Sequence, residues 1–135
     1  MASCYDYFEI QPLCNNMFLV GAEGRGVGSV EVLKDYFALL FPTYYQGEGF
    51  AGTVIDAFSA GIPVVASNWK YNAEIVTEGK NGFVFETHDI RKLAVILEKA
   101  SQDPDMFNSL KTNCIDCALE YAPEKALESL FANIN

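Results

Sequence analysis

Basic residues are scarce in this chain of 135 residues. Nine Lys and Arg stand against 18 Asp and Glu, which gives a formal net charge of −9. Nucleic acids and anionic lipid surfaces are bound through clustered Lys and Arg, so this composition predicts neither as a partner. A polyanionic ligand would be repelled by the net charge and would have to be held by a local device such as backbone amides.

Long hydrophobic runs are also absent. Phe37–Phe41, with five residues, is among the longest, whereas a helix needs roughly 20 apolar residues to cross a bilayer. Met1–Asp6 lacks a basic segment followed by an apolar core, so no signal peptide is predicted. Without export signals, the four cysteines are expected to be reduced thiols and the compartment to be the cytoplasm; they are Cys4, Cys14, Cys114 and Cys117.

Apolar residues make up 50% of the chain, enough for the core of one domain. Residues 1–28 form an atypical N-terminal segment in which we place one short strand, and residues 29–135 are predicted to be the folded domain. From Ser29 the pattern becomes regular, beginning with a short helix to about Asp35. Continuous apolar runs then predict buried strands, at Phe37–Phe41, Pro63–Ala66 and Gly82–Phe85.

Helical signals separate and follow these runs. One helix is expected from Gly52 to Ala60, closed by Gly61, and another over Asn72–Thr77. Asp89 can cap a longer helix, whose apolar face we assign to Leu93, Ala94, Ile96 and Leu97. Proline marks two further helix starts, at Pro104 and Pro123. Strands alternating with helices predict the α/β class, with a parallel sheet covered by helices on both faces.

The segment Gly47–Phe58 is the most informative for function. A strand leads into a loop with three glycines, and the loop runs directly into a helix that starts near Gly52. First-turn amides have no intrahelical acceptor, and the helix dipole adds partial positive charge there. The amides around Gly52, Thr53 and Val54 therefore form a candidate phosphate site at the carboxyl edge of the sheet.

Two carboxylates bracket this helix start, Glu48 before it and Asp56 within it. Carboxylates repel phosphate, so they are better suited to accept hydrogen bonds from the hydroxyls of a sugar and a ribose. Phosphate flanked by polyhydroxylated groups describes a nucleotide sugar. The alternative is an ordinary helix with Glu48 on a surface loop and Asp56 solvated.

Residues from about Ser29 onward resemble the C-terminal, donor-binding domain of retaining glycosyltransferases of family 4, which have the GT-B fold. The motifs that carry the resemblance are Glu48-Gly49-Phe50, the run Asp56–Ser67, Glu74-Ile75-Val76 and the run Asn81–Phe85. By this resemblance the chain is a truncated, Rossmann-like half of such an enzyme. Cleavage of a nucleoside diphosphate sugar would proceed with retention and would need no metal or other cofactor.

The resemblance also implies residue roles. Glu48 and Asp56 fall on two family acids with seven residues between them, so they would contact the transferred sugar and the ribose respectively. Backbone amides of the intervening segment would hold the diphosphate, from Gly49, Phe50, Ala51, Gly52, Thr53 and Val54. The family more often has Glu at the second position, so Asp56 is a departure. A family Arg and Lys on the diphosphate, and an acceptor-binding domain, have no counterpart here.

The predicted function is therefore the donor-binding half of a sugar transferase acting on a saccharide or lipid-linked acceptor, inactive by itself. The partner would be a nucleotide sugar, with a separate acceptor-binding domain. The alternatives are a non-catalytic nucleotide-sugar-binding remnant and a self-associating structural fragment. An exposed sheet edge would favour self-association.

Other motifs have structural explanations. Cys114 and Cys117 form a CxxC that could join Cys4 and Cys14 at zinc, but the spacing of the first pair is unmatched and the second pair falls in a predicted helix. Asp103-Pro104-Asp105 resembles a metal-binding DxD but fits helix capping, and the Gly24–Gly28 run lacks dinucleotide spacing. His88 is assigned to a surface loop and Asn72 to a helix cap; Lys70 is a candidate phosphate partner.

Overall fold

The computed structural model describes residues 17–19, 33–34, 36–44, 46–47 and 52–134. Within them four parallel strands form one sheet in the order β1-β2-β3-β4. Their bounds are Met17–Leu19 (β1), Ala38–Phe41 (β2), Val64–Ser67 (β3) and Gly82–Phe85 (β4). The helices are α2 (Gly52–Ser59), α3 (Asn72–Ile75), α4 (Ile90–Gln102), α5 (Pro104–Asn108), α6 (Lys111–Glu120) and α7 (Pro123–Ile134). The predicted α/β class is confirmed.

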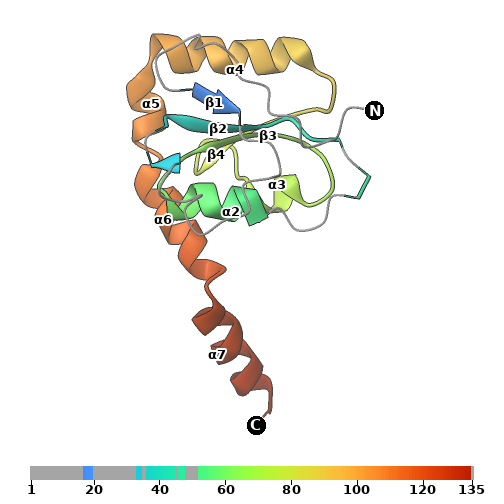
Figure 1. The fold of residues 1–135 in the computed structure, drawn as a ribbon, viewed down its shortest axis with the longest axis vertical. Helices are drawn as coiled ribbons and strands as arrows, with labels where there is room; N and C mark the ends of the chain where they lie inside the picture. The colour runs from blue at the N-terminus through green and yellow to red at the C-terminus, as the bar shows by residue number, and fades with distance from the viewer. Residues whose placement is uncertain (1–16, 20–32, 35, 45, 48–51, 135) are drawn as a thin grey trace.

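Helices cover both faces of the sheet, with α4 on one side and α2, α3 and α6 on the other (Figure 1). Side chains alternate between these layers because successive residues of a strand point to opposite faces. Leu39 and Phe41 of β2 pack in a cluster with Phe58 and Cys114, from α2 and α6. Ala38 and Leu40 pack in a second cluster with residues of α4 and α5. All four residues of β2 and of β3 are buried, as their continuous apolar runs predict.

The predicted helix boundaries follow local signals. Gly61 closes α2 with φ +74°, and the amide of Ile62 donates to the carbonyl of Ala57 (2.9 Å). The Asp89 side chain caps α4 by accepting from the Lys92 amide (3.0 Å), and Asp103 caps α5 through Met106 (3.3 Å). The short strand expected within the first 28 residues is confirmed by β1, whereas the expected helix over 29–35 falls mostly outside the described residues.

One prediction about the apolar face of α4 is wrong. Ala94 is exposed, whereas Ile96 and Ala100 are buried and Leu93 and Leu97 are partly buried. Leu93, Ile96, Leu97 and Ala100 follow the i, i+3, i+4, i+7 spacing of one helix face. Ala94 is turned about 100° away from Leu93 because the helix has 3.6 residues per turn.

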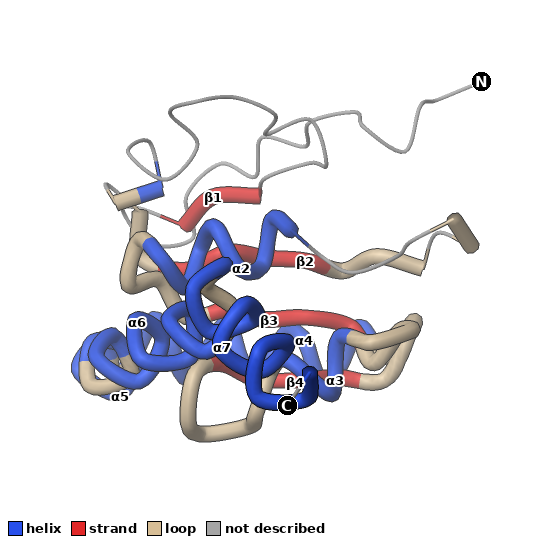
Figure 2. The backbone as a smooth tube through the Cα atoms, turned by 90° about the horizontal axis from the view of Figure 1, so that it is seen from below, coloured by secondary structure: helices blue, strands red, loops and turns tan. Residues whose placement is uncertain are grey.

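Helix α7 differs from the others because it extends away from the body of the molecule beyond α6 (Figure 1). It has no buried residue. Four apolar side chains are at least half exposed, from Leu127, Leu130, Phe131 and Ile134. Seen from below, the parallel strands lie side by side, and the loops that follow β2 and β3 extend beyond the same edge of the sheet (Figure 2).

Candidate functional site at the carboxyl edge

The loops that follow β2, β3 and β4 are tied together at the carboxyl edge of the sheet. The Ser67 hydroxyl, at the end of β3, donates to the backbone carbonyl of Thr43 after β2. On its other side, the Asn68 side-chain amide donates to Glu86 Oε1 (3.0 Å), and the Thr87 hydroxyl donates to the Asn68 carbonyl (3.2 Å). Parallel α/β folds bind ligands at this edge, and here its loops are held by hydrogen bonds.

Helix α2 begins at this edge with open space at its first residue. Gly52 is exposed, and a Cβ added there would meet no atom of the described residues within 4 Å. Thr53 is partly exposed, whereas the Val54 side chain is fully buried in the core. Only the backbone amide of Val54 is therefore in a position to serve a ligand. The first-turn amides of α2 have no intrahelical acceptor, so the sequence-predicted phosphate site has the required helix start.

Asp56 lies one turn after Gly52 on the same side of α2, because residues four apart share a helix face. It is partly buried. Its Cα–Cβ bond tilts toward the helix start, as in every α-helix, and Gly52 places no side chain in its way. The axial separation of the two residues is about 6 Å. Glu48, Gly49, Phe50 and Ala51 lie outside the described residues, so the proximity of Glu48 to Asp56 stays a prediction.

The loop after β3 departs from one prediction. Asn72 does not cap α3; it is buried, and its side-chain amide donates to the Ser67 carbonyl (3.0 Å). That carbonyl ends β3 and also accepts from the Trp69 amide (2.8 Å), so the buried Asn72 amide is its second donor and fixes the loop against the end of the strand. In the same loop Lys70 has φ +50°, and its ammonium lies 5.5 Å from the centre of the Trp69 ring. Its contact with phosphate stays a prediction.

His88 lies on a surface loop, as predicted, and is exposed. Its ring contacts the ring of Tyr44, with centroids 4.8 Å apart and planes inclined by 52°. The pairing was missed from the sequence because the two residues follow different strands. The available signal was that Tyr44 and His88 each stand three positions after a strand end, at Phe41 and Phe85.

The CxxC pair lies within α6, as predicted. Cys114 is buried and donates to the Asn81 carbonyl (3.4 Å), and Cys117 accepts from the Asn81 side-chain amide (3.4 Å). Burial, reinforced by the neighbouring Cys117, raises the pKa of the Cys114 thiol to about 12. Burial also raises the pKa of Cys117. Both are free thiols that stabilise the packing of α6. The zinc alternative also involves Cys4 and Cys14, which lie outside the described residues. The Gly24–Gly28 run lies outside them as well.

Asp103-Pro104-Asp105 acts in helix capping, as predicted. Asp103 ends α4 and its side chain caps α5, while Pro104 occupies the first turn of α5. In the described part of the chain, no helix is long and apolar enough to span a membrane.

A parallel α/β sheet with an open helix start at its carboxyl edge is the architecture of Rossmann-like ligand-binding units. Comparison with known proteins identifies the family to which this chain belongs. Residues 26–116 match the family described as Glycosyl transferases group 1. The chain belongs to this family.

Two of the curated relatives are named as glycosyltransferases of phosphate-containing polymers. The chain is 30% identical over 83 residues to the poly(glycerol-phosphate) alpha-glucosyltransferase of Bacillus subtilis (strain 168), covering 61% of this chain and 12% of the relative. It is 28% identical over 125 residues to the poly(ribitol-phosphate) alpha-N-acetylglucosaminyltransferase of Staphylococcus aureus (strain COL), covering 89% of this chain and 24% of the relative. The chain thus spans less than a quarter of the length of either.

The fold is similar to that in the crystal structure of TarM. The TM-score is 0.61 at 27% identity, and the superposition covers 78% of this chain and 21% of TarM. The resemblance to GT-B glycosyltransferases is thereby confirmed.

Proposed function

We propose that this chain binds the nucleoside diphosphate sugar used by a retaining glycosyltransferase. The observation that carries the proposal is the open start of α2 at the carboxyl edge, where Gly52 leaves the first-turn amides uncovered by any side chain of its own. The diphosphate would accept from the amides of Gly52, Thr53 and Val54, where the helix dipole favours negative charge. In a chain of net charge −9, backbone amides are a means of binding an anion without a cationic surface.

The two carboxylates would then recognise hydroxyls on either side of the diphosphate. Asp56, one turn into α2, would accept from the ribose, and Glu48 from the transferred sugar. Membership of the glycosyltransferase family supports these roles. We propose that transfer also needs an acceptor-binding part outside these residues, since the chain spans 12% and 24% of the two relatives.

Titration calorimetry with UDP-glucose and GDP-mannose tests the proposal. We expect binding of one of them with no transfer by the chain alone. Asp56→Asn should weaken binding about tenfold, because a charged acceptor of hydroxyl hydrogen bonds is lost. Asp116→Asn, at an exposed position of α6, is the matched control and should bind normally. No binding of either nucleotide sugar by folded protein would contradict the proposal, and turnover by the chain alone would contradict the need for a second part.

A second candidate is self-association through α7. Its apolar stripe of Leu127, Leu130, Phe131 and Ile134 is exposed, and such stripes on helices form helix–helix interfaces. Light scattering coupled to size exclusion would give a dimer or larger mass under this alternative, and Phe131→Glu would restore the monomer. A monomeric mass of the unaltered chain would remove this candidate.

A further inference from the structure

We propose that Tyr44 and His88 form a binding surface for one pyranose ring at the carboxyl edge, an inference that rests on the proposed function. The two residues come from loops on either side of β3, because β2 and β4 both pair with β3. Adjacent strands lie about 4.8 Å apart, so these loops must span the end of β3 for their rings to meet. The centroid distance of 4.8 Å shows that they do.

Hydrogen bonds from β3 and its loop fix both loops. Ser67 bonds the Thr43 carbonyl immediately before Tyr44, and Thr87 immediately before His88 bonds the Asn68 carbonyl. On the C-terminal side of His88, the backbone amide of Ile90 donates to the His88 carbonyl (2.9 Å). His88 has φ +69°, a conformation that is uncommon for residues other than glycine and that recurs where a ligand site requires it. The rings are thus presented by a constrained backbone.

The Tyr44–His88 pair is not part of the hydrophobic core of the described residues. Tyr44 is 61% exposed, His88 is exposed, and neither belongs to the two buried clusters. Two exposed aromatic residues, with their rings tilted against each other, are therefore held together at the edge where the donor is proposed to bind. Such an arrangement is typical of ligand sites that use aromatic side chains for contact area and polar atoms for orientation.

A neutral sugar ring fits this surface better than a phosphate. The C–H face of a pyranose can pack on an aromatic ring, and its hydroxyls can bond the Tyr44 hydroxyl and the imidazole nitrogens of His88. Among the described residues no cation contacts the two rings, and the net charge of −9 opposes an anion. The pyranose would be either the donor sugar or a saccharide acceptor.

Nuclear magnetic resonance of the labelled full chain distinguishes these sources. The amides of α2 report the diphosphate, and the rings of Tyr44 and His88 report the sugar. We titrate with UDP, UDP-glucose, GDP, GDP-mannose, methyl α-glucoside and maltotriose. Ring shifts with a nucleotide sugar but not with its free nucleotide assign the donor sugar. Ring shifts with methyl α-glucoside or maltotriose, without nucleotide, assign the acceptor. Both results support the proposal.

The same spectra separate this inference from the proposed function. Shifts of the α2 amides with unmoved rings in every titration would overturn the inference and leave donor binding intact. Ring shifts with sugars and unmoved α2 amides would contradict the diphosphate site and support the sugar surface. Unmoved rings together with unmoved amides would overturn both.

Variants give the second readout. Tyr44→Ala and His88→Asn should each lower sugar affinity roughly tenfold, the size expected for loss of an aromatic contact. Asn tolerates the left-handed backbone of residue 88, so this change removes the ring without forcing the loop to move. Tyr44→Phe should bind within about threefold of the unaltered chain. Tyr121→Ala, at an exposed tyrosine after α6, is the control. Unchanged affinity in both Tyr44→Ala and His88→Asn would overturn the proposal.

Discussion

Gly82, at the start of β4, packs directly against the backbone of Val64 in β3. A Cβ added to Gly82 would lie 2.9 Å from the Val64 carbonyl carbon and 3.0 Å from its nitrogen, and closer still to its carbonyl oxygen. Val64 is itself fully buried and paired with Gly82 in the parallel register. Neither strand can shift without disturbing the core on both faces of the sheet.

Gly82→Ala is therefore expected to lower the free energy of unfolding by about 3 kcal/mol, as overpacking against fixed backbone does. Urea denaturation followed by circular dichroism measures this change. Gly52→Ala is the control, because open space surrounds that position; its stability should stay within about 0.5 kcal/mol of the unaltered chain. Equal stability of the two variants would contradict the close packing at Gly82.

Asn81 joins the turn before β4 to α6. Its side chain accepts from the Thr77 amide (2.8 Å) and donates to the Ile75 carbonyl (3.2 Å) and to Cys117 Sγ. Asn81→Ala leaves the buried Ile75 carbonyl and the part-buried Thr77 amide without their side-chain partner, so we expect a loss of about 2–4 kcal/mol of stability.

Asn113→Ala is the matched control for Asn81. Its amide donates to the Lys80 carbonyl (3.0 Å) at an exposed position, where water can replace it, so about 0.5 kcal/mol or less should be lost. Thermal or urea unfolding of both variants checks the prediction, which would be wrong if the two losses were similar.

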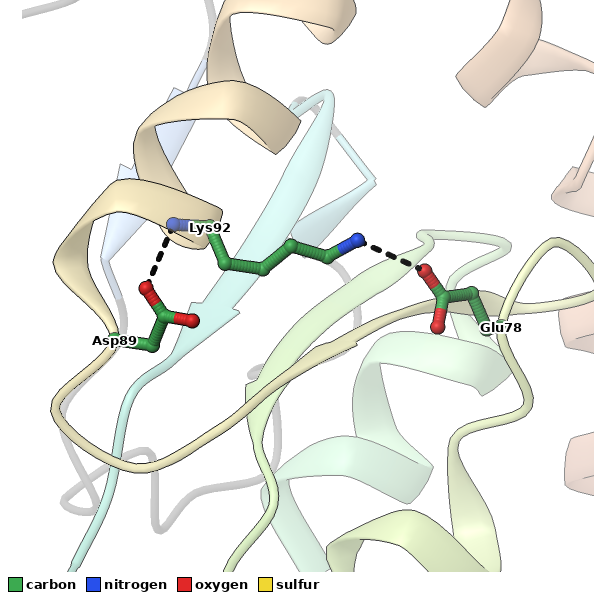
Figure 3. A network of polar contacts seen from close by, with 3 residues as sticks. All are labelled: Glu78, Asp89 and Lys92. Carbon is green, nitrogen blue, oxygen red and sulfur yellow. Dashed lines mark hydrogen bonds and ion pairs between the residues drawn. The ribbon is translucent and has the colours of Figure 1, made fainter.

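At the start of α4, Lys92 takes part in two different interactions, a helix cap and an ion pair. Asp89 accepts from the Lys92 amide, while the Lys92 ammonium lies 3.7 Å from Glu78 (Figure 3). Asp89→Ala should cost about 1 kcal/mol, the usual value of a helix cap. Glu78→Gln should cost less than about 0.5 kcal/mol, because both charged side chains are substantially exposed. Urea unfolding at low and at high salt tests the difference: the effect of Glu78→Gln should disappear at high salt, whereas most of the effect of Asp89→Ala should remain because a capping hydrogen bond is lost.

Cys114 links stability to alkaline pH. Its pKa is about 12 in the folded chain against an ordinary value of 9.0, so the unfolded chain loses this proton first as the pH rises. The contribution of Cys114 to stability is complete below pH 9 and decreases between pH 9 and 12, by up to about 1.4 kcal/mol per pH unit. Cys114→Ala should flatten this part of the curve of stability against pH. Unaltered slopes between pH 9 and 10.5 would contradict the prediction.

Cysteine reactivity gives an independent check of the same burial. Thiolates are the reactive species, and Cys114 is buried whereas Cys117 is partly exposed. At pH 8 an alkylating reagent should modify Cys117 before Cys114, with both slower than in urea. Mass spectrometry of peptides identifies the order, and prior modification of Cys114 would show that α6 opens readily.

The strand positions and the helix ends were predictable because their causes are local. Gly82–Phe85 has the predicted bounds, and Asp89, Asp103 and Gly61 perform the capping roles that their positions indicate. The face of α4 was misassigned at Ala94, because an apolar residue that small is also common at exposed helical positions. Asn72 was misassigned because its partner, the Ser67 carbonyl, depends on how a loop folds back on the end of β3.

The candidate site was predictable only in part. The open start of α2 at Gly52 follows from the glycines and the strand before it, whereas the relation of Glu48 to Asp56 stays a prediction. The contact of Tyr44 with His88 was missed because their matching positions, three residues after β2 and β4, do not by themselves show that the two loops meet across the end of β3.

The sequence by itself determined the order of strands and helices, the caps at Asp89 and Asp103 and the family, because these depend on residues within a few positions of one another. Only the tertiary structure decided which side chains share the carboxyl edge, that Gly82 must lack a side chain beside Val64, and that the Asn81 amide turns toward α6. These relationships arise when the sheet and helices pack, since burial then demands a partner for each polar group and room for each atom.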